Sequence, residues 1–282
     1  MAVNDFAAGI YEDVPELDYH SGAFGPVGSL SSTEAKRILE APAVLKWYRD
    51  NPQPPKATYD LGHVVHSLVL GTGLDVYVHD WTDMRTKAAK EDVADARDRG
   101  EVPIKRADFE QMQAVADAVL THPVAGPIFE KGTPEQSIYA TDPQTGVWMR
   151  GRVDWATEDA LVDLKTSTTA IPNEWSRQAA SLEYAVQREF YRQIWEQITG
   201  EADRQFLHVV VSKTEPYLVA VMEMDLDFEA VGKSKVRRAL DLYKKCLDTD
   251  TWPGIPPIIH RLAPPAYYIN AEEELEAELE IH

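Results

Sequence analysis

The stretch GRVDWATEDALVDLKTSTT, residues 151–169, constrains the fold most, because it has the pattern of two short strands around a polar turn. Apolar and polar residues alternate over residues 147–155 and again over residues 160–166. Strict alternation of this kind is typical of half-buried strands. The turn between them is Thr157-Glu158-Asp159. The stretch therefore predicts a β-hairpin.

Two acids and a lysine converge in this hairpin. Folding it about its turn makes Asp154 and Asp163 cross-strand neighbours on one face, and the two-residue period puts Lys165 on that face as well. Like charges placed opposite each other destabilise a strand pair, and a divalent cation removes that penalty. Lysine beside such a metal can orient or deprotonate a water. The stretch thus predicts metal-assisted phosphodiester hydrolysis, while a solvated hairpin with a surface Asp163 and Lys165 is the alternative that this stretch alone leaves open.

The charge of the chain limits how it could handle nucleic acid. The formal net charge is −19, and the last twelve residues, AEEELEAELEIH, carry six glutamates and no Lys or Arg. Such a balance argues against passive coating of nucleic acid. If the protein acts on DNA, we expect its basic residues to line a channel against an acidic exterior, with bound cations adding positive charge where phosphate sits.

The composition also predicts the setting. With 282 residues the chain suits one large domain or two small ones, and its hydrophobic content of 44% is ordinary for a soluble globular protein. No apolar run approaches the length of a membrane span, and the acidic beginning of the sequence does not resemble a secretory signal. One cysteine, Cys246, excludes an intramolecular disulfide and a cysteine-held iron–sulfur cluster. We expect a cytoplasmic protein without membrane contact.

The remaining pattern alternates helices and strands. Ser31 and Glu34 form a capping box for a helix that should run to Glu40, and Asp60 is the expected cap of the helix LGHVVHSLVLG. Further expected elements are a helix at 43–49, strands at 76–81, 135–140, QFLHVVVS and YLVAVMEM, and helices at 108–120, 173–198 and 227–247. This order predicts an α/β (α+β) fold with a mixed central sheet flanked by helices.

We expect a single catalytic domain over residues 1–270. It would comprise an N-terminal helical part, about residues 1–130, and a catalytic core, about residues 131–260. The acidic tail, residues 271–282, is predicted to be either a short helix or disordered.

Several polar residues outside the hairpin are candidate site residues. His66 lies at the margin of an apolar helical stripe, where a structural histidine is the alternative to a metal ligand. Gln187 and Tyr191 lie one turn apart on one helix face, a common pairing. Arg85 and Lys87 lie in a charge run that could contact phosphate or be solvated. Arg150 and Arg152 share a strand face with Asp154, and they could hold phosphate or pair with carboxylates. Glu135 is a further carboxylate or a surface residue.

The hairpin resembles the signature of PD-(D/E)XK nucleases, with Asp154 as the first acid followed by Asp163-Leu164-Lys165. The residue before the first acid is Val153 and not proline, at a position that varies in the superfamily. A restriction-endonuclease-like core is the fold that this resemblance implies.

A longer set of motifs resembles the nuclease domain of exodeoxyribonuclease VIII, the RecE-type phage recombination exonuclease. The resemblance extends from about Tyr19 to Trp252. Its pieces, in order, are Tyr19-His20, SLSSTEAKRI, APAVLKWYR, YDLGHVVHSLVLG, RTKAAKE, EQSIYATDPQTGVWMRGRVDW, VDLKTS, EYAVQREFY and CLDTDTWPGI. Each piece alone is weak, but the order and the spacing together are specific.

The resemblance implies a role for each candidate. Asp154, Asp163, His66 and the Leu164 carbonyl would bind Mg²⁺, with Mn²⁺ as a substitute. Lys165 would position the attacking water. A second set would line the active site or contact DNA: catalytic Gln187, Tyr191 and Glu135, and DNA-binding Arg85, Lys87, Arg150 and Arg152.

The implied activity is Mg²⁺-dependent 5′-to-3′ digestion of linear double-stranded DNA, which leaves 3′ single-stranded overhangs for recombination by single-strand annealing. The implied partners are double-stranded DNA ends, a single-strand annealing protein and further copies of the chain in a ring. Two alternatives stay open from the sequence. One is another PD-(D/E)XK endonuclease or structure-specific nuclease, and the other is a non-catalytic DNA-end-binding recombination module.

Overall fold

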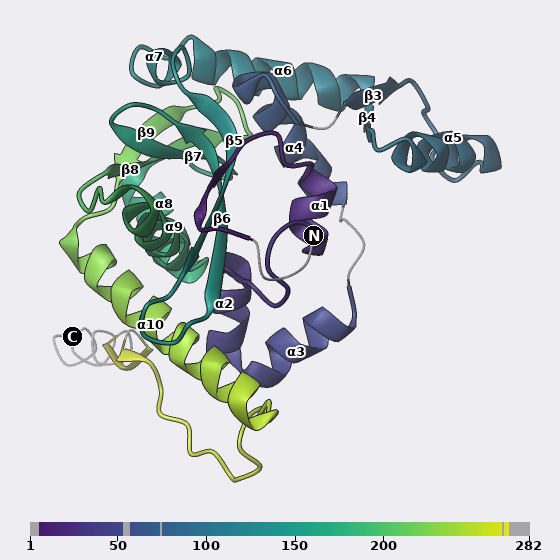
Figure 1. The fold of residues 1–282 in the computed structure, drawn as a ribbon. Helices are drawn as coiled ribbons and strands as arrows, with labels where there is room; N and C mark the ends of the chain where they lie inside the picture. Colours follow the sequence, from purple (N-terminus) through teal and green to yellow (C-terminus); the bar gives the residue numbers. More distant parts are fainter. Residues whose placement is uncertain (1–5, 53–56, 74, 267, 271–282) are drawn as a thin grey trace, which may run out of the picture.

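A seven-stranded mixed sheet lies at the centre of the structure, a computed structural model that describes residues 6–52, 57–73, 75–266 and 268–270 (Figure 1). The strand order is β1-β5-β6-β7-β8-β9, and β2 pairs with β6. The strands are β1 (Gly9–Tyr11), β2 (Leu30–Ser31), β5 (Thr133–Thr141), β6 (Trp148–Ala156), β7 (Ala160–Ser167), β8 (Gln205–Ser212) and β9 (Val219–Glu223). The predicted mixed sheet and the predicted hairpin are confirmed.

Strands β6 and β7 separate soon after the turn that joins them. Their antiparallel ladder consists of Trp155 opposite Val162 and Ala156 opposite Leu161. At the other end of the same β6 edge, the short strand β2 pairs in parallel with Met149. The middle of β6 therefore faces a fork between β2 and β7, whereas its opposite edge pairs with β5 along nearly its whole length.

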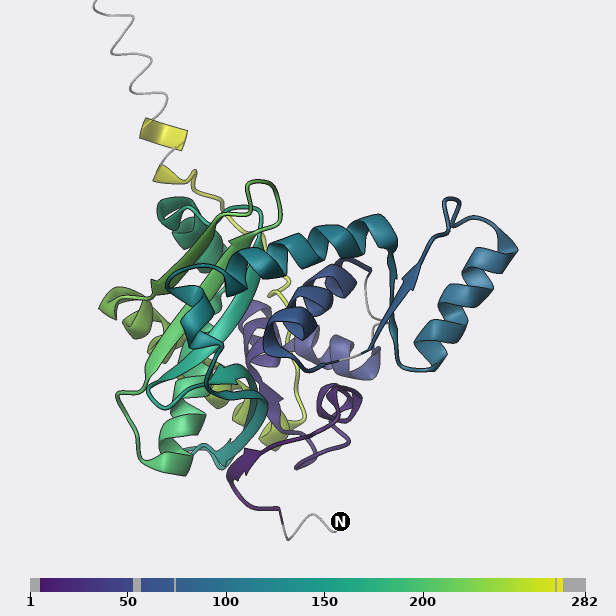
Figure 2. The same cartoon turned by 90° about the horizontal axis from the view of Figure 1, so that it is seen from above.

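Helices cover both faces of the sheet (Figures 1 and 2). On one face, α2, α9 and α10 enclose a core that includes Ile38, Phe190 and Leu240. On the other face, α4 and α6 enclose a core that includes Val65 and Val115. The helices are α1 (Glu16–Ser21), α2 (Ser32–Glu40), α3 (Pro42–Asp50), α4 (Ala57–Leu70), α5 (Lys87–Asp98), α6 (Arg106–Leu120), α7 (Ala125–Ile128), α8 (Pro172–Ser181), α9 (Tyr184–Thr199) and α10 (Leu226–Thr249).

The capping residues fix where several helices begin. The predicted capping box is present at α2, where the Ser31 hydroxyl accepts from the Glu34 amide and the Glu34 carboxylate accepts from the Ser31 amide. The Asp225 carboxylate caps α10 in the same manner, by accepting amide hydrogen bonds in the first turn. The expectation for Asp60 is wrong, because α4 begins at Ala57 and so contains residue 60.

The helix expected over residues 173–198 is two helices in the structure. Helix α8 begins at Pro172, which suits a first helical turn because that turn needs no amide donor. The chain then breaks at Glu183, whose φ of 58° is left-handed, and α9 begins at the next residue. The break matters because it places Tyr184 at the start of α9, beside the acids of the hairpin.

A small unit projects from the body of the molecule. Strands β3 (Val76–His79) and β4 (Val102–Lys105) form a parallel pair, and α5 connects them (Figure 2). The strand expected at 76–81 is thus present in shorter form. Over residues 80–101 the unit carries five Lys and Arg residues against seven Asp and Glu residues, so it is not a basic arm by net charge.

The N-terminal part is not only helical, since it also supplies β1 and β2 to the central sheet. Among the helices that the structure describes, none is both long enough and apolar enough to cross a membrane. The acidic tail, 271–282, lies outside the described residues.

Candidate active site

The fork between β6 and β7 is held open by a side chain. Where the ladder would continue, the Asp154 carboxylate accepts a hydrogen bond of 2.8 Å from the Leu164 amide. The acid thus satisfies an amide that the strand pair leaves without a backbone partner. Asp154 immediately precedes Trp155 and Asp163 immediately follows Val162, and Trp155 and Val162 are the pair furthest from the turn, so both acids lie at the mouth of the fork.

Histidine 66 reaches the same point from helix α4. Its Nε2 lies 2.8 Å from the Leu164 carbonyl oxygen, and its Nδ1 lies 3.7 Å from the Asp154 carboxylate. Helix α4 is placed there by the apolar residues of its other positions, including Val64 and Val65, which are fully buried against the sheet. The structure therefore brings together the four groups that were predicted as metal ligands, Asp154, Asp163, His66 and the Leu164 carbonyl.

Asp163 is the most enclosed acid of the site, with 1% of its surface exposed. Its Oδ1 accepts hydrogen bonds of 2.8 Å from Lys165 and 2.7 Å from Gln187 of α9. The Lys165 ammonium is also 2.8 Å from Oδ2, but in a direction that does not form a hydrogen bond, and Oδ2 has no hydrogen-bond partner among the described residues. One oxygen of Asp163 is thus fixed and the other is available.

The two acids have opposite electrostatic surroundings. Burial raises the pKa of Asp154, and the nearby charge of Asp163 raises it further, against the opposing effect of His66. Burial acts on Asp163 in the same direction, but the charge and hydrogen bond of Lys165, together with His208 and His66, lower the pKa of that carboxyl overall. Although burial disfavours its charge, Lys165 itself has a raised pKa because both carboxylates face it. The lysine is therefore charged, and Asp163 is ionised beside it.

These groups fit a hard divalent cation. Two carboxylates and a backbone carbonyl supply the oxygen ligands that Mg²⁺ and Mn²⁺ take, and the buried Oδ2 of Asp163 accepts no hydrogen bond among the described residues. Within the described part of the chain, no group of three His, Cys, Asp or Glu side chains is placed to hold a metal ion by itself. An ion here would therefore rely on the Leu164 carbonyl and on waters, as magnesium commonly does.

Helix α9 carries two further predicted residues. Gln187 contacts Asp163, as described, and Tyr191 lies one turn further along, buried against the backbone of Gly151. A β-carbon at residue 151 would come within 2.8 Å of the Tyr191 ring, so this close approach requires glycine. Tyr191 therefore packs beneath the site, whereas Gln187 contacts an acid directly.

Glu135 and the two strand arginines form a network behind the acids. Burial and the charge of Asp154 raise the pKa of Glu135 to about 8, against the effect of Arg152, whose Nε lies 3.6 Å from the Glu135 carboxylate. Arg152 also bonds to Ser137 and lies over the ring of Tyr19. Arg150 lies 3.5 Å from Glu34. Both arginines are therefore paired inside the protein.

The other two predicted DNA contacts lie on the projecting unit. Arg85 pairs with Asp83 at 3.0 Å, and Lys87 lies 3.4 Å from Glu91. Both side chains are about nine-tenths exposed, and they are free to reorient toward a ligand.

Three residues near the acids were not predicted from the sequence. Tyr184 is flanked by Lys165 and by Lys36 of α2, each with its ammonium 5.1 Å from the ring centre. His208 of β8 lies opposite Asp163 in the parallel ladder, is fully buried, and has no hydrogen-bond partner for either ring nitrogen among the described residues. Burial lowers its pKa to about 4, so the ring is neutral at neutral pH. Only tertiary contacts reveal these three.

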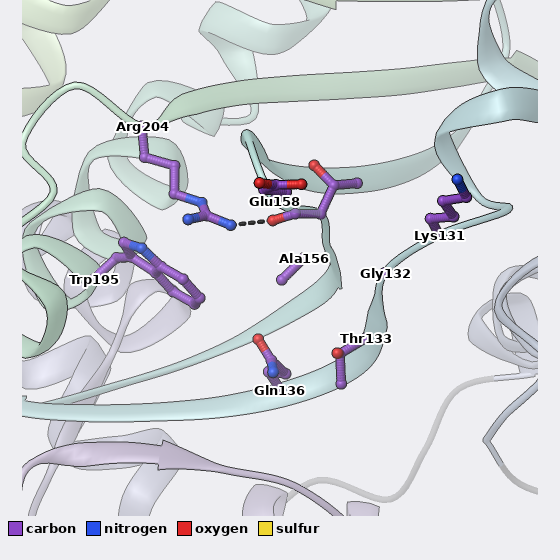
Figure 3. A pocket seen from close by; sticks show the side chains of 9 residues that line it. Lys131, Gly132, Thr133, Gln136, Ala156, Glu158, Trp195 and Arg204 are labelled. Carbon is purple, nitrogen blue, oxygen red and sulfur yellow. Dashed lines mark hydrogen bonds between the residues drawn. The ribbon is translucent and has the colours of Figure 1, made fainter.

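A separate hollow of about 350 Å³ lies at the turn end of the hairpin, away from the acids (Figure 3). Arg204 crosses it, donating to the Thr157 carbonyl and lying over the Trp195 ring. Its other lining residues are Lys131, Gly132, Thr133, Gln136, Ala156 and Glu158. None of the three hairpin residues Asp154, Asp163 and Lys165 lines it, so the hollow is not part of the acid cluster.

Comparison with known proteins agrees with this geometry. The model of a family described as a PDDEXK-like domain of unknown function (DUF3799) matches residues 31–256. No curated protein matches the chain.

One solved structure is similar in fold, and a second matches more weakly. A candidate exonuclease from Eubacterium rectale superimposes with a TM-score of 0.60 at 14% identity, over 93% of this chain and 98% of that one. A phage-related exonuclease from Haemophilus somnus 129PT gives a TM-score of 0.34 at 11% identity, over 79% of this chain and 96% of that one. Since the family model covers most of the sequence, including the whole hairpin and the α9 residues, the chain belongs to the PDDEXK-like family DUF3799.

Proposed function

We propose that this protein is a Mg²⁺-dependent 5′-to-3′ exonuclease that digests linear double-stranded DNA and leaves 3′ single-stranded overhangs. The single observation that carries the proposal is the arrangement at the fork. Asp154 and Asp163 converge there, Lys165 lies 2.8 Å from Asp163, and the Leu164 carbonyl faces His66. Family membership supports nuclease activity, and nucleases of this class generally use divalent metals.

The residues of the site divide the work of hydrolysis. A divalent metal bound by Asp154, Asp163, the Leu164 carbonyl and His66 would activate the phosphate and a water as a Lewis acid. Gln187 holds Asp163 in one orientation through a 2.7 Å hydrogen bond. Lys165 is charged and lies 2.8 Å from Asp163, where its ammonium can orient a water and offset charge on the phosphate.

The acidic character of the chain is part of the proposal. At a formal charge of −19, attraction to DNA must be local, and we place it at the fork, where Lys165 lies and a bound cation would add positive charge. We propose that copies of the chain assemble as a ring, which would set a basic lumen against an acidic exterior. A single-strand annealing protein would take up the 3′ strand for recombination in a phage or prophage setting, in the host cytoplasm.

The test is digestion of linear duplex DNA labelled separately at each 5′ and 3′ end, with Mg²⁺ and with EDTA, beside a closed circle of the same DNA. We expect early loss of the 5′ label, only with metal and only from the linear form. Loss of the 3′ label first would reverse the polarity, and cutting of the circle would identify an endonuclease.

The Asp154→Ala variant is the matched control for the site. It should bind the same duplex and cleave none of it. Cleavage at the wild-type rate by this variant would exclude the fork as the active site, and DNA binding without cleavage by the wild type would leave a DNA-end-binding module.

A further inference from the structure

A lysine outside the hairpin motif faces the fork from helix α2. The Lys36 ammonium lies 5.1 Å from the centre of the Tyr184 ring, and the Lys165 ammonium lies 5.1 Å from the same centre. The two ammonium nitrogens are therefore at most about 10 Å apart. The capping box of α2 places Lys36 there, because it fixes the first turn of the helix next to β6.

The Lys36 ammonium forms no ion pair with a carboxylate among the described residues. Its ammonium donates to the Leu182 carbonyl at 2.9 Å, and within the described residues no carboxylate lies within ion-pair distance of it. Glu183 is the acid of the adjoining segment, but it is bound by Lys235 at 2.5 Å. Asp163 is paired with Lys165 in the same way. A half-buried cation near a second cation is unfavourable unless an anion joins them.

The pKa of Lys36 agrees with this surplus of positive charge. Burial and, after it, repulsion by Lys165 lower that pKa to about 8, against the opposing effects of Asp163 and Glu183. An anion bound between the two lysines would relieve the repulsion and hold Lys36 in its charged form.

Resting on the proposed nuclease function, we propose that Lys36 binds a phosphate of the DNA strand in the fork, adjacent to the phosphate that is cut. Its amine has two protons left beyond the one given to Leu182, enough to hold one phosphate oxygen pair. Tyr184, half-buried between the two lysines, separates the two phosphate positions and offers a ring face to the sugar or base between them.

A purely structural role for Lys36 is the competing explanation. The Leu182 carbonyl belongs to the end of α8, and a lysine there stabilises a helix terminus. That role would change the melting temperature of the protein but not the number of ions released when DNA binds. The two explanations therefore predict different salt dependences.

The experiment measures binding of a fluorescent duplex with Ca²⁺ in place of Mg²⁺, in the Asp154→Ala background, from low to moderate salt. Lys36→Met should weaken binding about tenfold. It should also lower the slope of log affinity against log salt by about 0.7–0.9, the value of one phosphate contact. Lys36→Arg should retain the slope, and so should Lys46→Met, which removes a surface lysine that pairs with Asp50.

Uncharged methylphosphonates in the DNA give a second readout that does not depend on the stability of the variant. Each duplex carries one methylphosphonate near the 5′ end. At one position this substitution should weaken DNA binding about tenfold when the protein has Lys36, and should not weaken it in the Lys36→Met variant. The assignment is wrong if Lys36→Met keeps the wild-type salt slope and loses as much affinity as the wild type at every methylphosphonate position. That failure would leave wild-type cleavage intact, whereas absence of wild-type cleavage would overturn the nuclease function itself.

Discussion

The Nε2 atom of His66 lies 2.8 Å from the Leu164 carbonyl oxygen, so two groups assigned to the same metal contact each other directly. Since a carbonyl only accepts, Nε2 carries the hydrogen in this arrangement. Metal binding by His66 must therefore break this hydrogen bond or use the other ring nitrogen, which faces Asp154 at 3.7 Å. The residues are close to a metal-binding arrangement and need a small rearrangement of the histidine.

Replacement of His66 should weaken metal binding and leave the fold intact. We expect His66→Asn to lower Mn²⁺ affinity by on the order of 10- to 100-fold, measured by calorimetry, because the other ligands are kept. Cleavage should return at high metal concentration. The matched control is His63→Asn one turn earlier, whose ring pairs with Glu16 instead of the acids. Equal metal affinity in both variants would remove His66 from the ligand set.

Replacement of Lys165 should make stability depend on metal. Lys165→Met leaves the buried Asp163 carboxylate without its cation, so the free energy of unfolding in EDTA should fall by about 3 kcal/mol. Added Mg²⁺ should restore more stability to this variant than to the wild type, as judged by the melting temperature. Lys235→Met, which breaks the ion pair with Glu183, should lack that metal-dependent recovery. Cleavage should be lost in Lys165→Met at every metal concentration.

The Glu34 carboxylate should stabilise the fold only above acidic pH. Burial raises its pKa, but the 2.7 Å hydrogen bond and the charge of Arg49, together with Arg150 and the Ser31 amide, lower the pKa below its usual 4.5. Its stabilisation is therefore complete above pH 4.5 and is lost as the pH falls through the lowered pKa. We expect Glu34→Gln to cost about 2 kcal/mol at pH 7 and progressively less toward pH 3, by urea unfolding.

The exposed Glu40 at the end of α2 gives the control for this measurement. Glu40→Gln should change the free energy of unfolding by less than about 0.5 kcal/mol at both pH values. A pH-independent loss in Glu34→Gln would show that the hydrogen bonds to Ser31 and Arg49 matter through geometry and not through the carboxylate charge.

A methyl group at residue 151 should displace Tyr191. The added β-carbon would lie 2.8 Å from the Tyr191 ring and 3.1 Å from Ile138, so Gly151→Ala should destabilise the protein by about 1–3 kcal/mol. It should also slow cleavage, because Tyr191 shares α9 with Gln187. Gly9→Ala, where the β-carbon meets its nearest atom at 3.8 Å, should leave both quantities near wild type. Unchanged activity in a destabilised Gly151→Ala would confine Tyr191 to packing.

The sequence predicted the parts of the site that depend on local pattern. The alternation over residues 147–166 locates both strands within a residue or two, and the capping box locates α2, because each signal involves neighbours in the chain. The α8–α9 boundary was missed because Leu182 and Glu183 carry no glycine or proline signal, and a left-handed glutamate is unusual. Strand β2 has two residues, too few to show a period.

Contacts between distant residues account for the rest. Lys36, Tyr184 and His208 come from three separate elements, and their approach to Asp163 depends on how α2 and α9 pack against the sheet. Side-chain pairing is equally invisible in the sequence. Arg150 and Arg152 share a strand face with Asp154 as predicted, yet one pairs with Glu34 and the other contacts Glu135 and Tyr19.

The fork between β6 and β7 also governs when the site can exist during synthesis. The hairpin with both acids can form early, since its strands are adjacent in sequence. Its surroundings are contributed by residues as far apart as Leu30, which pairs with Met149, and Gln187, which bonds to Asp163. Contacts of such long sequence separation form slowly, because a large loop must close first. A ribosome-bound chain that ends before α9 would thus display the motif while lacking the enclosure that surrounds it in the complete protein.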